Sequence, residues 1–166
     1  AEYQRAVEAK SVLALCFAEA AETYHHWKVF SPGSDGVCLE FEKSELAKST
    51  KNDQRFDYRS VEYKTINCAS ASGIETQNLP FIKRYPYQDE REFRLIFVDY
   101  HKSLGAQKLD IPLKAVKRIT LSPWMPKALA DSIKPVLKGI RGCKNLKIYR
   151  STLIENERWK SAIAQG

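Results

Sequence analysis

Glu92-Phe93-Arg94-Leu95-Ile96-Phe97-Val98-Asp99 is the stretch of sequence that decides the fold. It is the strongest strand signal in the chain, because aromatic and β-branched residues favour extended backbone. Shorter strands are predicted on either side of it, at Ser11–Phe17, Val37–Phe41, Arg59–Thr65, Gln107–Ile111, Val116–Leu121 and Leu146–Tyr149. Since these strands do not alternate regularly with helices, we expect an α+β fold with a mostly antiparallel sheet that could be split in two.

Few helices accompany the strands. The end of a helix is predicted within Ala1–Lys10, and further helices at Lys43–Lys51, from Pro126 to about Ile140, and around Trp159. Ala20–Lys28 is predicted to be a short helical or irregular segment. Asn67–Pro80 is rich in small and polar residues and is predicted to be a loop. Pro126 suits the first turn of the long helix, and Gly142 suits its end.

The long helix is predicted to be amphipathic. Its apolar stripe is expected to face the core and consists of Leu129, Ile133, Val136, Leu137 and Ile140. The opposite face carries Lys127, Lys134, Lys138 and Arg141. Pro135 is expected to kink or shorten this helix, because proline lacks the backbone N–H and clashes with the preceding turn.

The length and composition indicate one globular domain over residues 1–166, with 43% hydrophobic residues arguing against disorder. No apolar run approaches the ~20 residues that span a bilayer, and Ala1–Lys10 does not resemble a signal peptide. The four cysteines form no CxxC pair, and Cys16 and Cys38 are predicted to be buried in strands. We therefore expect a cytoplasmic protein with reduced thiols and no membrane partner.

The net charge of +7 is concentrated in one part of the chain. Residues 101–150 contain 12 Lys and Arg and 2 Asp, a balance of +10, whereas residues 1–100 contain 13 basic and 16 acidic residues. A basic face attracts polyanions, so nucleic acid is the expected partner. The residues predicted to contact it are Lys127, Lys134, Lys138, Arg141 and Lys147. The alternative is a solvated face that only aids solubility.

The densest group of ionisable residues enters the strongest strand. Glu90, Glu92 and Arg94 are two residues apart and should project to the same side of an extended chain. A pair of carboxylates could stabilise an oxocarbenium-like transition state at a ribose, as carboxylates do in glycoside cleavage. Glu92 and Glu90 are therefore the predicted catalytic residues. The alternative is a strand end with exposed salt bridges.

A second cluster combines aromatic and imidazole side chains. Tyr24, His25, His26, Trp27 and Phe30 could line a pocket for a flat ring by stacking and hydrogen bonding. The alternative is a packed Trp27 with histidines on the surface. Adjacent histidines do not share one side of a helix and no Hxx(x)H pattern occurs, so no metal site is expected here.

A third feature is Glu62-x-Lys64 on a predicted strand. Many metal-dependent nucleases combine such a pair with an acid on an earlier strand, so that the carboxylates hold Mg²⁺ and the lysine steadies the attacking water. Asp35 or Glu40 could supply the earlier acid. The alternative is that the two charged residues alternate on a half-exposed strand, which is ordinary for such strands.

Four motifs in order resemble a bacterial family called domain of unknown function 2971, over about residues 11 to 150. They are Cys16-Phe17-Ala18-Glu19, Trp27 and Phe30 followed by Gly36-Val37-Cys38-Leu39-Glu40-Phe41, Val61-x-Tyr63, and Glu90-Arg91-Glu92-Phe93-Arg94. The chain departs from the family pattern at Ala18, Phe30 and Phe93, where the family has Ser, Tyr and Trp. A strand expected before the first helix is also absent from this sequence.

A second resemblance concerns activity. Pro86-Tyr87 followed by Glu90-x-Glu92 is similar to the Glu/Gln-x-Glu element of ADP-ribosyltransferases. This resemblance implies an ADP-ribosyltransferase-like fold and NAD as substrate, with Glu92 holding the 2′-hydroxyl of the nicotinamide ribose. Glu90 would face the acceptor and help to deprotonate it, and the residues from Tyr24 to Phe30 would bind nicotinamide.

Three functions are therefore considered. The first is an ADP-ribosyltransferase that modifies a macromolecule, with nucleic acid favoured, and acts as a toxin or phage-defence effector whose partner is an antitoxin or another defence protein. The second is a non-catalytic nucleic-acid-binding module of a bacterial defence system. The third is a metal-dependent nuclease.

Overall fold

The computed structural model describes residues 2–164, except for the side chain of Ser72. Within these residues the chain forms two compact units, each assembled from two segments of sequence. Unit 1 comprises Ala1–Ala21 and Ala47–Asp110, and unit 2 comprises Glu22–Leu46 and Ile111–Gly166, over the described residues. A compact unit is not by itself a separately folding domain, so the expectation of one domain stays a prediction.

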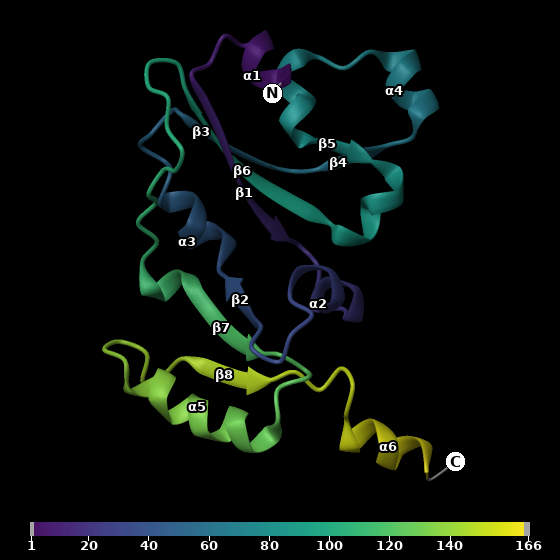
Figure 1. Ribbon diagram of the computed structural model, residues 1–166, viewed down its shortest axis with the longest axis vertical. Coiled ribbons are helices and arrows are strands. Elements are labelled where there is room, and N and C mark those ends of the chain that lie inside the picture. The colour runs from purple at the N-terminus through teal and green to yellow at the C-terminus, as the bar shows by residue number, and fades with distance from the viewer. Residues whose placement is uncertain (1, 165–166) are drawn as a thin grey trace. The chain divides into compact units, whose positions relative to one another are not determined.

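Unit 1 is built around the strand that dominates the sequence. Its elements are α1 (Glu2–Ala6), β1 (Ser11–Ala18), β3 (Phe56–Ser60), β4 (Glu62–Lys64), α4 (Ile66–Ser72), the 3₁₀ helices η1 (Thr76–Phe81) and η2 (Tyr85–Glu90), β5 (Ile82–Arg84) and β6 (Glu92–Asp99). Figure 1 shows β6 between β1 and β3. Both neighbours pair with β6 in antiparallel orientation, and β4 pairs with β5 in parallel orientation.

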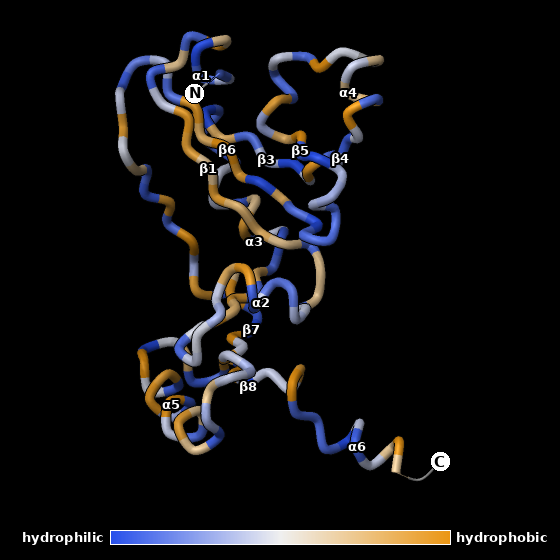
Figure 2. Tube along the Cα trace, turned by 45° about the vertical axis from the view of Figure 1, so that its right-hand side comes forward, coloured by the Kyte–Doolittle hydropathy of each residue, from blue (hydrophilic) through white to orange (hydrophobic). Residues whose placement is uncertain are grey.

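β6 is the central strand of this sheet, and side chains on both of its faces are buried. Phe93, Leu95, Ile96 and Phe97 are each at most 6% exposed. On one face, the ring of Phe97 lies 5.0 Å from that of Phe56 on β3. Figure 2 shows that hydrophobic residues also dominate β1, which covers the other edge of β6. The hydrophobic effect therefore drives the pairing of these three strands.

Unit 2 has a second three-stranded sheet. Its elements are α2 (Tyr24–Phe30), β2 (Val37–Phe41), η3 (Leu113–Ala115), β7 (Val116–Leu121), α5 (Lys127–Gly139), β8 (Lys147–Arg150) and α6 (Glu157–Ile163), and α3 (Lys43–Lys48) crosses from this unit into unit 1. The strand order is β2-β7-β8. β2 is antiparallel to β7, whereas β8 is parallel to β7 because α5 forms the crossover between them.

The α+β prediction is confirmed, since antiparallel strand pairs and several helices make up both units. The prediction of one strand over Arg59–Thr65 is wrong in part. The chain bends at the buried Val61, whose N–H donates to the carbonyl of Glu92, and the residues after the bend form β4 with a different partner.

Three further local predictions are wrong. Gln107–Ile111 is irregular and finds no strand partner within the described residues. Part of the predicted loop Asn67–Pro80 is helical, because the Thr65 side chain caps α4 by accepting from the N–H of Cys68. Cys16 and Cys38 lie in strands as predicted, but both residues are exposed because β1 and β2 are edge strands.

The apolar stripe predicted for the long helix is also corrected. Ala130 is fully buried and packs with Leu121, Met125 and Ile148, and Ile133 and Leu137 extend this cluster. The remaining members of the predicted stripe are exposed: Leu129 by 46%, Val136 by 70% and Ile140 by 55%. Because Ala130 has a small side chain, α5 approaches the sheet along the Ala130–Ile133–Leu137 line instead.

No helix in the described part of the chain is both long enough and apolar enough to cross a lipid bilayer.

The two-sided burial of β6 leads to a stability prediction. Leu95 and Leu15 face each other across the β6–β1 pair, yet Leu95 is 5% exposed and Leu15 is 45% exposed. We expect Leu95→Ala to lower the free energy of unfolding by ~2–5 kcal/mol through cavity formation, and Leu15→Ala to cost less than half as much. Chemical denaturation of both variants measures this difference. Equal losses would contradict the assignment of β6 as the centre of unit 1.

Candidate functional site

Glu92 is the first residue of β6, and its side chain is only 9% exposed. Arg91, immediately before it, adopts a left-handed backbone with φ of 43°, which ends η2 and starts the strand. The backbone N–H of Glu92 donates to the hydroxyl oxygen of Tyr63 at 2.7 Å. Strand pairing and this hydrogen bond therefore fix the position of the Glu92 backbone.

The Glu92 carboxylate is held by two basic side chains. Arg94 donates from Nε to Oε1 and from a terminal nitrogen to Oε2, both at 2.8 Å, and Lys83 Nζ lies 3.2 Å from Oε2. Arg94 also donates to the carbonyl of Pro80 at 2.6 Å, which anchors the guanidinium. Glu92 and Arg94 thus meet on one side of β6, as residues two apart in a strand must.

Glu90 also lies next to Lys83 and Glu92, but not because Glu90 and Glu92 alternate along one strand as predicted. It lies in η2, before the strand begins, and its carboxylate accepts a hydrogen bond from Lys83 Nζ at 2.5 Å. Lys83, on β5, therefore bridges Glu90 and Glu92. The structure brings the two predicted catalytic acids together, and Lys83 is the residue that the sequence did not reveal, since no motif distinguishes Ile82–Arg84.

The electrostatics of this group keep Glu92 ionised. Burial raises the pKa of Glu92, but hydrogen bonds from Arg94, Cys16 and Lys83 outweigh burial and lower the pKa to about 2. Although Cys16 is exposed as a residue, partial desolvation of its thiol and the hydrogen bond to Glu92 raise the pKa of the thiol to about 11. At neutral pH the group therefore presents a carboxylate at Glu92 and a protonated thiol at Cys16, so Glu92 suits charge stabilisation rather than proton donation.

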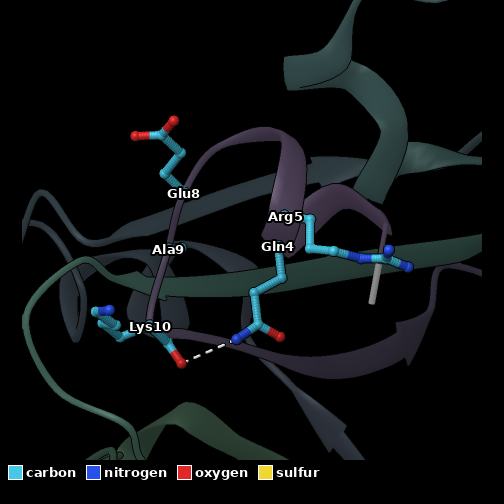
Figure 3. Close-up of a pocket in the computed structure, with 5 residues that line it drawn as sticks. All are labelled: Gln4, Arg5, Glu8, Ala9 and Lys10. Atoms are coloured by element: carbon cyan, nitrogen blue, oxygen red, sulfur yellow. Dashed lines mark hydrogen bonds between the residues drawn. The ribbon is translucent and has the colours of Figure 1, made fainter.

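A shallow, open hollow lies elsewhere in unit 1. Figure 3 shows its lining by Gln4, Arg5, Glu8, Ala9 and Lys10, with the Gln4 amide donating to the Lys10 carbonyl at 2.9 Å. Glu90 and Glu92 are not among its lining residues. This hollow therefore adds no surface to the acidic pair.

The predicted ring-binding residues are on α2 of unit 2. Trp27 is 3% exposed, and its indole N–H donates to the Glu22 carboxylate at 2.8 Å, so it belongs to the packed interior. Tyr24 meets Trp124 edge to face, and Lys28 Nζ lies 4.9 Å from the centre of the Trp124 ring. Lys28 therefore occupies one face of the Trp124 ring.

The imidazoles lie on the same helix. His26 stacks on Phe30 with ring centres 6.3 Å apart, and His25 meets His26 edge to face. Phe30 is 64% exposed, so one of its faces is available to a ligand. Because α2 belongs to unit 2 and the acidic pair to unit 1, a pocket shared by both stays a prediction.

The predicted nucleic-acid contacts all belong to unit 2. Lys127, Lys134 and Lys138 lie on α5, Arg141 follows it, and Lys147 lies on β8. Lys134 pairs with Asp131 at 3.0 Å. The other four make no ion pair with any carboxylate of residues 2–164 and are exposed. Their charge is therefore available to an anionic partner.

The predicted nuclease residues belong to different units. Glu62 and Lys64 pair with each other at 3.3 Å on β4 in unit 1. Asp35 and Glu40 are in unit 2, where Glu40 pairs with Arg118. Within the residues that the structure describes, no group of three or more His, Cys, Asp or Glu side chains is placed to hold a metal ion.

Comparison with protein-family models, with curated proteins and with solved structures finds no match to this chain.

The ionised state of Glu92 leads to a pH prediction. We expect Glu92→Gln to lower the free energy of unfolding at pH 7 by ~2 kcal/mol, because hydrogen bonds to charged groups contribute ~1.5–3 kcal/mol. The pKa of Glu92 falls from 4.5 to about 2 on folding, so its stabilisation is complete above the unfolded value and is lost as pH falls toward the folded value.

Denaturation of wild type and Glu92→Gln between pH 7 and pH 2 measures this effect, and the difference between them should shrink below about pH 4.5. Asp89→Asn, at an exposed acid three residues earlier, serves as the control. A difference that is the same at pH 7 and pH 2 would show that the Glu92 charge contributes nothing.

Proposed function

We propose that the chain is an ADP-ribosyltransferase-like enzyme that transfers ADP-ribose from NAD to a macromolecule, with nucleic acid as the favoured acceptor. The observation that carries the proposal is the convergence of Glu90 and Glu92 on Lys83, with Glu92 buried and ionised. Modification of RNA or DNA is an activity that would suit a toxin or a phage-defence effector. The resemblance of Glu90-x-Glu92 to the transferase element supports the same assignment.

Each acid has a distinct role in the proposed reaction. The bond between the nicotinamide nitrogen and the ribose carbon breaks, and nicotinamide leaves as a neutral molecule with the bonding electrons. Positive charge develops on the ribose, and the Glu92 carboxylate stabilises it. The acceptor atom then bonds to the ribose carbon and passes its proton to Glu90. The low pKa of Glu92 suits this role, since only the ionised form stabilises a cation.

The hydrogen bonds around Glu92 indicate how a substrate would enter. A carboxylate offers about four acceptor positions, and Arg94, Lys83 and the Cys16 thiol occupy them. The contact from Lys83 is longer to Glu92, at 3.2 Å, than to Glu90, at 2.5 Å. A ribose hydroxyl would therefore displace Lys83 from Glu92 while Lys83 stays bound to Glu90.

The test is incubation with NAD labelled in the adenylate part, in the presence of a mixed pool of RNA, DNA and protein. We expect label on nucleic acid and release of nicotinamide. Glu92→Gln should slow nicotinamide release by ~10²–10³-fold, the usual effect of removing one transition-state contact. Glu90→Gln should retain nicotinamide release and lose transfer to the acceptor.

Asp89→Asn is the matched control, because Asp89 is an exposed acid in the same segment. Circular dichroism of each variant establishes that it is folded. A network with a structural role alone gives the opposite result, in which Glu92→Gln loses stability while wild type and variant release the same trace of nicotinamide. That result would exclude the proposed enzyme.

A second candidate is a nucleic-acid-binding module, favoured by the unpaired cations of unit 2. Lys127, Lys138, Arg141 and Lys147 make no ion pair within the described residues, so binding to phosphates breaks no existing salt bridge. Such contacts would also serve the transferase by holding its acceptor. The two candidates differ in whether NAD is consumed.

Binding of a fluorescent single-stranded oligonucleotide at increasing salt tests this candidate. Affinity should fall steeply with salt, and Lys138→Gln or Lys147→Gln should each reduce the logarithmic slope by ~0.7–1. Lys108→Gln removes an exposed lysine of unit 1 and should leave the slope unchanged. Affinity that does not depend on salt would rule the candidate out.

A further inference from the structure

Part of one sheet face in unit 2 is not covered by any helix. Val37 and Leu39 on β2 pair with Leu121 and Ile119 on β7, so the four side chains share the face on which α5 packs. Leu121 is 1% exposed beneath α5, whereas Val37 is 52% and Leu39 is 46% exposed. α5 therefore covers β7 and β8 and leaves the apolar surface of β2 open.

The adjacent side of α5 is also apolar and exposed. Leu129 and Val136 are two turns apart and point in nearly the same direction, ~90° from the buried line through Ala130. The crossover from β7 through α5 to the parallel β8 is expected to be right-handed, which turns this side of α5 toward β2. The lysines of α5 then face the opposite side, beyond β8.

The exposed side chains of Leu129 and Val136 on α5 and of Val37 and Leu39 on β2 thus border the uncovered part of this sheet face. We call the apolar surface that these four residues provide the α5–β2 groove. Helices pack side by side on a sheet face at a spacing of ~10 Å, so a sheet of three strands has room for a second helix next to α5. The groove is apolar and matches the apolar side of an amphipathic helix.

The C-terminal helix α6 has such a side with nothing packed on it. Trp159 and Ile163 are four residues apart, so they lie on one face, and they are 67% and 63% exposed. Just before the helix, Leu153 and Ile154 are 43% and 45% exposed. Tryptophan is enriched in protein interfaces, so its exposure here favours a surface that another chain covers.

The α6 helix is held away from the sheet of its own unit. Ser151 donates its N–H to the carbonyl of Leu121, and Asn156 both caps α6 and donates to Thr152 at 3.2 Å. Figures 1 and 2 both show α6 leading away from β8 and α5. The hydrogen-bonded connection between β8 and α6 therefore leaves the apolar side of α6 exposed.

We propose that the chain forms a symmetric dimer in which α6 of each copy lies in the α5–β2 groove of the other. The area supports a second copy as the occupant. Nine exposed apolar residues contribute, namely Val37, Leu39, Leu129, Val136, Ile140, Leu153, Ile154, Trp159 and Ile163. At ~60–120 Å² each, they supply about 800 Å² per copy, which is what a stable interface buries on each partner.

The experiment is light scattering coupled to size exclusion with the full chain. Wild type should have the mass of a dimer at about 100 µM, a concentration at which weak specific dimers also associate. Trp159→Ser in α6 and Val136→Asp in the groove should each weaken association about 10-fold or more. Ile66→Ser, at a residue of unit 1 that is 69% exposed, is the matched control and should remain dimeric.

Mixing the two variants tests the reciprocal contact itself. In a heterodimer of the two variants, the intact α6 of the Val136→Asp chain meets the intact groove of the Trp159→Ser chain, and the second contact carries both substitutions. Because either substitution already disrupts a contact, the mixture should contain more dimer than either variant alone at the same concentration. Both positions are exposed, and circular dichroism checks that the variants are folded. A monomeric wild type, variants that associate as tightly as wild type, or a mixture with no more dimer than the separate variants would each overturn the proposal.

Discussion

The structure of unit 1 depends on one constraint, which is that the strand covered on both faces begins with a carboxylate. Glu92 cannot be withdrawn from water without compensation, because an unpaired buried charge is very unfavourable. Arg94 and Lys83 supply opposite charge, and the Cys16 thiol completes the hydrogen bonding. The need to satisfy this one group brings together β1, β5, β6 and η2, and the same cluster is the site for which we propose catalysis.

Five of the six strands in the two three-stranded sheets follow from local sequence, because runs of aromatic and β-branched residues specify extended backbone, whereas β3 was predicted only at Arg59 and Ser60. The proximity of Glu92 and Arg94 was predictable for the same reason, since it depends only on residues two apart in one strand. The position of Lys83 was not predictable, because β5 reaches the start of β6 through a parallel pairing with β4 that leaves no periodic signal. Long-range pairing, unlike strand formation, has no local sequence signature.

The long helix shows a second limit of sequence reasoning. Two apolar stripes of α5 are equally regular, one through Leu129, Ile133 and Val136 and the other through Ala130, Ile133 and Leu137. The first is the more hydrophobic, so the sequence favours its burial. The structure buries the second, because the small Ala130 lets α5 approach the sheet closely. Amphipathicity therefore identifies the helix but does not select between overlapping stripes, and Leu129 and Val136 stay exposed.

The two sides of α5 can serve different partners without competition. A right-handed crossover places its apolar side over β2 and its lysines beyond β8, so an α6 helix in the α5–β2 groove would leave the lysines uncovered. A symmetric dimer would present two such basic surfaces. Since each phosphate contact adds to the salt-dependent part of binding, two linked surfaces would bind a long nucleic acid more tightly than one. Dimer formation and acceptor binding would then reinforce each other through geometry alone.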